Sequence, residues 1–491
     1  MKRNKLLVLS LCAMACLAGC GENGENGGNQ QGNNNVPTGG YALRNVIKDD
    51  VTIEISTTFN DDYQAVINDA IEAFKAIEPK VTIKNTKESS DYNGLATKII
   101  NGFGAGEYPD ITAVYPDSVH DFINNDRGLD IQDYLYDKDI GFTTKDFEDI
   151  SDGYIKEGQS YVMPGTYSMP LSKSTEVMYY NADALLGLTL ANVNGGEPLT
   201  EAYFNNMTWE ELFDVFCPAI KAYNDAADAK DKIYDATDAK SCIVGYDSDD
   251  NWFITLAQQY GYGYTSVDDA SGRGKIDFNN DGMKGLMKKL NGYYKAKYIQ
   301  TQGTNGTYTS NLATTNKCLI SIGSSAGAKN QFSSTLKFDV GVAPLPYAKD
   351  GKRAVISQGP SMAFLDHKDE NRAKAAWLFY RFFSTTEYNT RWAIASNYLP
   401  IRYSVYEDPS YSAFSVVSDK AKNTVEICKA RTGAAAKATA PYLYTSPVFK
   451  GSSEARSQVK ALLTGCLTAE DINTSIDTLF KTAYDNTLLK M

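Results

Sequence analysis

The chain has 491 residues, and its 60 Asp and Glu against 48 Lys and Arg give a net charge of −12. This length corresponds to at least two domains, and an acidic chain without a basic block excludes the nucleic-acid-binding classes, which must neutralise phosphates. A mean hydropathy of −0.36 excludes a protein with many membrane spans. Because His120 and His367 are the only histidines, we expect no metal site and no cofactor.

The N-terminus carries the most specific signal. Three basic residues among the first five precede an apolar run over residues 6–16, which has the proportions of a signal peptide. The run ends in LAGC at residues 17–20, which resembles the lipobox of bacterial lipoproteins. That resemblance implies removal of residues 1–19 and lipidation of Cys20. The alternative is an ordinary signal peptide with a chance cysteine.

Residues 20–47 are mostly Gly and Asn in their first half. Such a composition buries too little apolar surface to offset the entropy of ordering, so we expect a flexible tether. A lipid followed by a tether and a globular body predicts a protein held at the extracytoplasmic face of the cell membrane.

The first part of the globular body alternates between strands and helices. β-Branched runs predict strands over residues 51–56, 81–85 and 109–115. Apolar residues at helical spacing predict helices over residues 61–77 and 92–103. Short links between these elements indicate an α/β layer with a largely parallel sheet.

The same mixture continues to the C-terminus. Strands are predicted over residues 173–183, 242–246 and 316–323, and an extended segment over residues 340–346. A helix begins at Thr208 as N-cap with Glu211 three residues later, a capping box. Further helices are predicted over residues 252–260 and 372–383, and mostly helix from residue 411 onward.

Several of these segments, in this order, resemble the extracellular solute-binding proteins of ABC importers, in particular the sugar-binding, maltose-binding-protein-like family. The segments that carry the resemblance are residues 109–111 (PDI), 174–185 (STEVMYYNADAL), 208–212 (TWEEL), 317–324 (KCLISIGS), 341–346 (GVAPLP), 375–379 (AAWLF) and 392–402. The likeness covers residues 50–490. Each motif is weak by itself, and their common order makes the likeness specific.

The resemblance implies a two-lobe α/β fold of type II with three crossover segments that form a hinge. Lobe I is expected over residues 48–172 and 345–400, and lobe II over residues 173–344 and 401–491. The implied function is a monomeric, non-enzymatic binding protein that captures a carbohydrate, an oligosaccharide by preference, between the lobes. Its implied partners are the transmembrane subunits of an ABC permease.

A sugar offers hydroxyls and apolar ring faces, which suit carboxylates, hydroxyls and aromatic rings. Trp252 is expected to stack on the ligand, or else to anchor its helix in the core. Asp117 can accept from sugar hydroxyls, or be a solvated loop acid. Arg402 is a candidate ligand contact, with a hinge ion pair as the alternative. The other candidates, placed at strand ends and crossovers, are Tyr92, Ser174, Thr175, Ser324, Ser325, Gly359, Ser361 and Tyr398.

Residues 323–327 (GSSAG) also match the nucleophile elbow of hydrolases. Such a site needs a histidine downstream, and only His367 is available, in a charged segment typical of an exposed turn. A hydrolase with two carboxylates is a further alternative, because no pair of acids is marked. We therefore expect no catalytic residues here.

Two patterns that could bind a metal are incomplete. Residues 277–282 match the first half of a calcium loop, but Lys288 stands where a bidentate Glu is needed. Five cysteines remain in the mature chain without CxxC spacing, and they are expected to be buried, with one disulfide left open.

The ligand class has one alternative on the same fold. The segment from Ser174 also resembles that of glycerol-phosphate-binding relatives, which carry an arginine near the segment similar to residues 448–451. Phe449 stands there in this chain. A dianion without an arginine fork is bound less well, so a neutral sugar is preferred, with Lys450 as the open point.

Overall fold

The computed structural model describes residues 41–415, except 90, 269–270, 272, 334 and 337, and residues 424–491. The predicted signal peptide, the lipidation at Cys20 and most of the predicted tether lie outside the described residues. No helix in the described part is both long and apolar enough to cross a membrane.

A first five-stranded sheet has the order β2-β1-β3-β13-β4. Its strands are β1 (Val51–Thr57), β2 (Val81–Lys87), β3 (Ile111–Val114), β4 (Ser168–Pro170) and β13 (Ser361–Phe364). β1 runs parallel to β2 and β3, whereas β13 is antiparallel to β3 and β4. The three strands predicted before residue 116 are confirmed as a parallel set.

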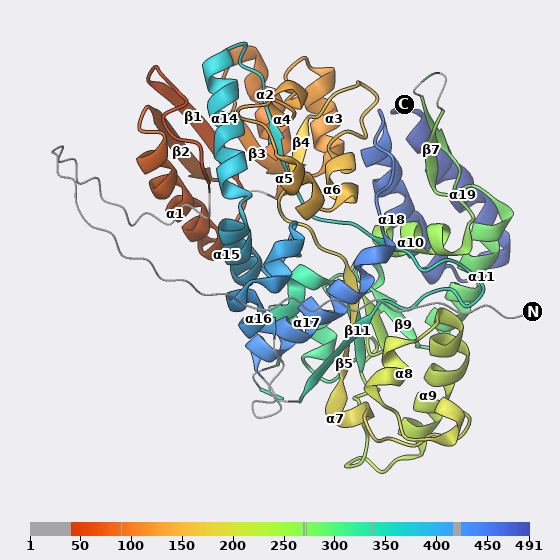
Figure 1. The fold of residues 1–491 in the computed structure, drawn as a ribbon. Helices are drawn as coiled ribbons and strands as arrows, with labels where there is room; N and C mark the ends of the chain where they lie inside the picture. The colour runs from red at the N-terminus through yellow and green to blue at the C-terminus, as the bar shows by residue number, and fades with distance from the viewer. Residues whose placement is uncertain are drawn as a thin grey trace, which may run out of the picture. The chain divides into compact units, whose positions relative to one another are not determined.

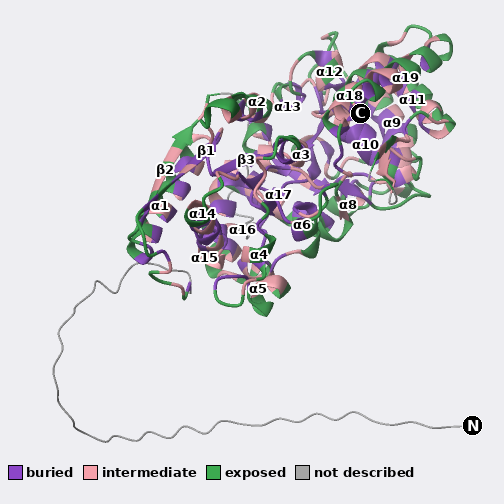
Figure 2. Ribbon diagram, turned by 90° about the horizontal axis from the view of Figure 1, so that it is seen from above, coloured by how far each residue is buried: buried purple, intermediate pink, exposed green. Residues whose placement is uncertain are grey.

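The helices of this first half follow from local signals. α1 (Asp61–Ile77) begins where the Asn60 side chain accepts from the Tyr63 N–H, and it ends just before Pro79. α14 (Glu370–Phe383) comes from far along the chain and lies beside β1 (Figure 1). Trp377 and Trp392, both fully buried, complete the core that β1 and β3 enter from the sheet side (Figure 2).

A second five-stranded sheet has the order β11-β5-β10-β6-β9. Its strands are β5 (Glu176–Asn181), β6 (Val244–Tyr246), β9 (Ile299–Thr301), β10 (Ile320–Ser324) and β11 (Val340–Pro344). β5 is antiparallel to both β10 and β11, and β6 is parallel to β10 and β9. The α/β class with two sheets is therefore as expected.

The remaining α-helices are α2 (Tyr92–Gly102), α3 (Pro116–Asn124), α4 (Gln132–Leu135), α5 (Thr144–Asp149), α6 (Asp152–Glu157), α7 (Ala182–Leu185), α8 (Glu201–Asn205), α9 (Cys217–Ala226), α10 (Asp249–Tyr260), α11 (Asp281–Lys295), α12 (Gln302–Asn305), α13 (Ser310–Ala313), α15 (Thr386–Ser396), α16 (Pro409–Ser415), α17 (Val425–Thr439), α18 (Ser452–Thr468) and α19 (Ile472–Leu488). Two small sheets pair β7 (Thr265–Val267) with β8 (Gly274–Ile276), and β12 (Val355–Ile356) with β14 (Leu443–Tyr444). A π-helix over Glu211–Phe216 follows Thr208, whose hydroxyl accepts from the Glu211 N–H at 3.1 Å.

The two sheets are joined by segments that pair with one another. Ser174 and Gln358 exchange backbone hydrogen bonds at 2.9 Å, and Lys173 pairs with Leu399. Leu345 and Val355, which the expected boundary gives to lobe I, pack in the core around the second sheet. The exact lobe limits stay a prediction.

All five cysteines of the body are buried and form no disulfide. The expectation of buried thiols is confirmed for Cys217, Cys242, Cys318, Cys428 and Cys466. Burial raises the pKa of the Cys466 thiol to about 12, which fits a packing role better than reactivity.

Candidate ligand-binding cleft

A polar cavity of about 270 Å³ lies where elements of both sheets meet. Three helices begin at it: α3 through residues 116–118, α10 through residues 250–251 and α18 through residues 452–457. The crossover at residues 357–359 and the loop at residues 445–448 complete its lining, with Asn93, Glu157 and Tyr264. The cavity therefore draws on segments that are far apart in the sequence.

Arg456 is the only cationic side chain that lines this cavity. Its Nη1 donates to Asp250 Oδ2 at 2.9 Å and to Asn251 Oδ1 at 2.7 Å, and its Nε lies 4.0 Å from Asp117 Oδ2. Burial lowers the pKa of this guanidinium, but Asp250 and Asp117 outweigh burial and raise it overall. The arginine is thus held charged at a fixed place.

Acidic side chains share the cavity with this arginine. Burial acts to raise the pKa of Asp250, yet Arg456 and the Ser248 hydroxyl hold it below its ordinary value. Asp117 accepts a hydrogen bond from the Ser452 hydroxyl. Glu157 accepts from Lys173 and from Ser361 Oγ, the latter at 3.2 Å. These carboxylates can accept hydrogen bonds from ligand hydroxyls.

Three polar atoms of the lining are buried and have no hydrogen-bond partner among the described residues. They are Ser357 Oγ, Gln358 Nε2 and Ser446 Oγ. A buried polar group without a partner costs free energy, so such groups in a cavity indicate that something polar completes them.

The helix ends add donors. α3, α10 and α18 have no side-chain cap at their N-termini. The backbone N–H groups of Asp117 and Ser453 have no acceptor among the described residues. Uncapped helix N-termini carry partial positive charge and favour oxygen atoms of an anion or a polyol.

Two of the candidate residues chosen from sequence, Asp117 and Gly359, line the cavity. Gly359 has φ of +94°, and a Cβ there would lie 1.8 Å from the Ser172 carbonyl oxygen, so the crossover needs a glycine. Tyr92 and Tyr398 lie behind the cavity, with their hydroxyls 3.4 Å apart. The ring of Tyr92 meets the cavity residue Tyr115 edge-on at 5.2 Å.

The candidates at the first crossover are buried supports and do not line the cavity. Thr175 Oγ1 donates to the Ile356 carbonyl at 3.2 Å, and the Thr175 N–H donates to Ser325 Oγ at 3.2 Å. Ser324 accepts from the Ala326 N–H, which starts a short helical turn. Ser174 and Ser361 hold the crossover and Lys173, respectively. Their proximity to ligand stays a prediction.

The expectation for Trp252 as a stacking platform is wrong in this structure. Trp252 is fully buried, and its ring stacks on Tyr246 at 5.0 Å and packs against Trp209 at 5.9 Å. Most of α10 is buried on all sides, so a tryptophan in its first turn enters the core. The alternative reading, a helix anchor, is the one that holds.

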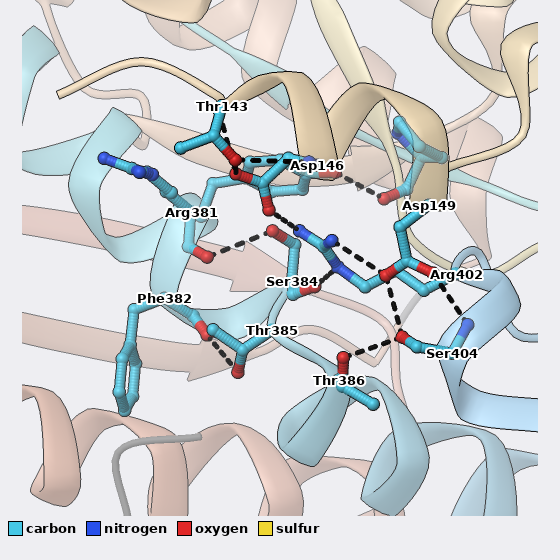
Figure 3. Close-up of polar contacts among 12 residues, drawn as sticks. Thr143, Asp146, Asp149, Arg381, Phe382, Ser384, Thr385, Thr386, Arg402 and Ser404 are labelled. Carbon is cyan, nitrogen blue, oxygen red and sulfur yellow. Dashed lines mark hydrogen bonds and ion pairs between the residues drawn. The ribbon is translucent and has the colours of Figure 1, made fainter. Parts of the chain in front are cut away.

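Arg402 is likewise a structural residue (Figure 3). Its side chain is 5% exposed and donates to Asp146 Oδ1 at 2.9 Å, to Asp149 Oδ2 at 3.1 Å and to the Ser384 carbonyl. Both acids belong to the segment around α5. The ion-pair alternative for Arg402 therefore replaces the ligand-contact expectation.

The nucleophile-elbow pattern lacks its partners. Within the described residues, neither Ser324 nor Ser325 hydrogen bonds to a histidine. His367 stacks on Tyr108 at 4.1 Å, and its Nε2 lies 3.8 Å from Asp110 Oδ1. No group of three or more His, Cys, Asp or Glu in the described part could hold a metal ion.

Sequence reasoning missed Arg456 and Tyr264. It placed weight on Phe449, which is buried and packs over Gly274, where an added Cβ would lie 2.0 Å from the ring. Arg456 lies seven residues later in the first turns of α18. The expectation that the cavity has no arginine is therefore wrong. A lone cation that follows a Gly-Ser-Ser helix start was the available signal.

Comparison with known proteins agrees with this architecture. Residues 69–420 match the model of the bacterial extracellular solute-binding proteins. A relative is the sn-glycerol-3-phosphate-binding periplasmic protein UgpB of Yersinia enterocolitica, 26% identical over 326 residues. That match covers 63% of this chain and 64% of the relative, so the chain spans slightly less than two thirds of that protein's length. UgpB of Escherichia coli K12 is 22% identical over 359 residues, 70% of this chain and 72% of the relative.

Solved structures share the fold. UgpB from Mycobacterium tuberculosis, in complex with glycerophosphocholine, has a TM-score of 0.66 at 17% identity, over 89% of this chain and 98% of that one. The GacH receptor of Streptomyces glaucescens, solved unliganded and with acarbose, has a TM-score of 0.64 at 16% identity, over 90% and 99% of the two chains. With a family model matched over most of its length, the chain belongs to the bacterial extracellular solute-binding proteins and has their type II fold.

Proposed function

We propose that this protein is the substrate-binding component of an ABC importer, and that its cleft takes a small glycerol-phosphate-type solute. The observation that carries the ligand class is Arg456 beside three uncapped helix N-termini in one cavity. A phosphate oxygen can accept from the guanidinium and from the free N–H groups at the helix starts. The names of the relatives point in the same direction.

The acids of the cavity narrow the proposal further. Asp117, Glu157 and Asp250 outnumber Arg456, so an added dianion meets net negative charge. A phosphodiester with one negative charge and free glycerol hydroxyls suits this balance better, because the carboxylates accept from the hydroxyls. A volume of about 270 Å³ favours a small solute over a long oligosaccharide.

A neutral carbohydrate remains the second candidate. The unpartnered Ser357, Gln358 and Ser446 atoms and the Tyr115 and Tyr264 rings suit sugar hydroxyls and ring faces as well. The two candidates differ in their demand on Arg456, since only a phosphate needs its charge.

The cellular setting is part of the proposal. The lipobox-like residues 17–20 support removal of the leader and anchoring through a lipid on Cys20, with the tether leading to a body that binds and does no chemistry. Cells that express Cys20→Ala should release the protein into the medium, and palmitate labelling should be lost. Retention of labelled Cys20→Ala protein in the membrane would disprove the anchor.

The ligand is tested by calorimetric titration of residues 41–491 with glycerol 3-phosphate, glycerophosphocholine and maltose. A ligand at about a hundredfold excess over Kd should also stabilise the native state by about 2.7 kcal/mol. Arg456→Gln should weaken phosphate-ester binding by about tenfold or more, because a charged hydrogen bond is lost. Lys460→Gln, one turn further along α18 and exposed, is the matched control.

The outcomes separate the candidates. Binding of maltose alone, unaffected by Arg456→Gln, would overturn the phosphate-ester proposal and favour the sugar. Turnover of a chromogenic glycoside or ester would overturn the whole binding-protein proposal.

A further inference from the structure

A second and larger cavity lies around the edge of the second sheet. Its volume is about 590 Å³, against about 270 Å³ for the cleft, and the two share no lining residue. It is bordered by the edge strand β11, by α17 and by the segment that runs from Leu345 to Val355. Its size falls within the range of ordinary small-molecule sites.

Tyr180 is the first sign that this cavity is built to hold something. The residue is only 3% exposed, and its ring is stacked on Phe204 at 4.2 Å. On the strand beside it, a Cβ at Gly341 would lie 2.1 Å from the Tyr180 Cζ, so the ring is clamped between a phenylalanine and bare backbone. Yet the hydroxyl of this clamped side chain donates to no acceptor among the described residues, and the residue lines the cavity.

Arg353 is the second sign. Its guanidinium lies 4.2 Å from the ring centre of Tyr347 and 5.7 Å from that of Tyr442, all three at the cavity. No carboxylate of the described residues is within ion-pair distance of it, whereas Arg431, also in the lining, is neutralised by Asp339 at 2.7 Å. Stacking on aromatic rings leaves the in-plane N–H groups of an arginine available to an anion.

The charge of the two cavities is opposite in sense. The cleft is lined by three carboxylates and one cation, and this cavity by one carboxylate, Glu201, and two cations. In a chain of net charge −12, a cavity with a cationic bias and a free arginine favours a negatively charged occupant.

The remaining lining is apolar and flat. Ala434, Ala435 and Ala438 on α17 face Val342 and Leu345 across the cavity. The short alanine side chains leave the room that a bulkier helix would fill. A ring or an acyl chain can bury apolar area there, at about 25 cal/mol per Å².

We propose that this cavity is a second ligand site, for a small organic anion with a flat apolar body, such as an aryl carboxylate or sulfonate. The anionic group lies at Arg353, the body lies against the α17 alanines, and the Tyr180 hydroxyl donates to a polar atom at the inner end. The site is separate from the cleft and does not depend on what the cleft binds.

Two matched dyes test the proposal on the body over residues 41–491. The anion is 8-anilinonaphthalene-1-sulfonate, and its neutral counterpart is N-phenyl-1-naphthylamine; both fluoresce when they enter an apolar site. We expect saturable binding of the sulfonate at one site per chain. Arg353→Gln should weaken the sulfonate by about tenfold and leave the neutral dye within about twofold, because only the anion uses the charge. The charge-matched control Arg391→Gln should change neither.

Variants that fill the cavity give an independent readout. Ala434 and Ala438 are exposed positions in a helix, so Ala434→Leu and Ala438→Leu should fold normally and weaken both dyes. Tyr180→Phe should weaken the sulfonate by a smaller factor. Unchanged binding of both dyes in Ala434→Leu and Ala438→Leu would overturn the site. Equal loss of both dyes in Arg353→Gln, at unchanged melting temperature, would overturn the anion.

Discussion

Arg402→Met is the sharpest test of how the segments near the last crossover are held. The substitution keeps an apolar stem beside Phe142, whose ring centre lies 5.7 Å from the guanidinium, and it removes the charge. The arginine loses its bonds to Asp146, Asp149 and the Ser384 carbonyl, and the two acids stay behind (Figure 3).

The size of the effect follows from burial and from the donors that remain. Breaking a buried ion pair costs about 3–5 kcal/mol, because a buried charge loses its partner. Here Asp149 still accepts from the Ser404 N–H at 2.7 Å, and Asp146 from the Thr143 N–H at 2.9 Å. We therefore expect the lower end, about 3 kcal/mol at neutral pH.

The loss should depend on pH with a definite sign. Burial acts to raise the pKa of Asp146, but hydrogen bonds from Thr143 and the charge of Arg402 hold it below its ordinary value. A depressed pKa contributes stability above the unfolded value near 3.9, and this stability is lost as the pH falls through the folded value. The gap between wild type and Arg402→Met should therefore be largest at neutral pH and shrink below about pH 4.

Urea unfolding followed by tryptophan fluorescence measures this gap from the shift in midpoint at unchanged slope. Arg391→Met is the control, since that side chain is 43% exposed and lies 3.9 Å from Glu387, and it should change stability by less than about 0.5 kcal/mol. A loss below about 1 kcal/mol for Arg402→Met, equal at all pH values, would refute the structural role.

Two further substitutions test residues of the second half. Trp252→Ala should lower the free energy of unfolding by about 3–5 kcal/mol, as for other buried tryptophans, and a urea midpoint equal to wild type would restore the stacking-platform hypothesis. Glu176→Gln tests a buried acid whose pKa burial raises to about 8. A raised pKa contributes stability below the unfolded value near 4.3 that is lost as the pH rises to about 8, so the Gln variant should gain on wild type across that window, and a constant difference would argue against protonated Glu176.

What the sequence predicts well in this protein is local. The helix over residues 61–77 was bounded correctly because Asn60, the apolar period and Pro79 all act within one or two turns. The order of strands in the sheets depends on contacts made late in the chain, such as those of β13, and no local pattern indicates them. The resemblance to a family supplied that part.

The candidate site divides in the same way. Asp117 and Gly359 were found because they stand where a strand or a crossover ends, and such places meet at the cavity. Trp252 failed because its polar neighbours Asp249 and Asn251 suggested an exposed helix start, while in the structure these polar side chains are themselves buried and hydrogen bonded. Local polarity does not report burial when polar groups satisfy one another.

Arg456 shows why a ligand class cannot be argued from one aligned position. The search for a phosphate-binding arginine at Phe449 gave the wrong answer, because the cation arrives from a helix that starts three residues later. In place, its charge is balanced by Asp250 and approached by Asp117, so its value to a ligand depends on three residues from three helices. A phosphodiester that draws Arg456 away from Asp250 must leave that carboxylate with other donors, and ligand hydroxyls are the donors that a glycerol ester brings. The same geometry that weakens a bare dianion therefore selects a phosphate that carries hydroxyls with it.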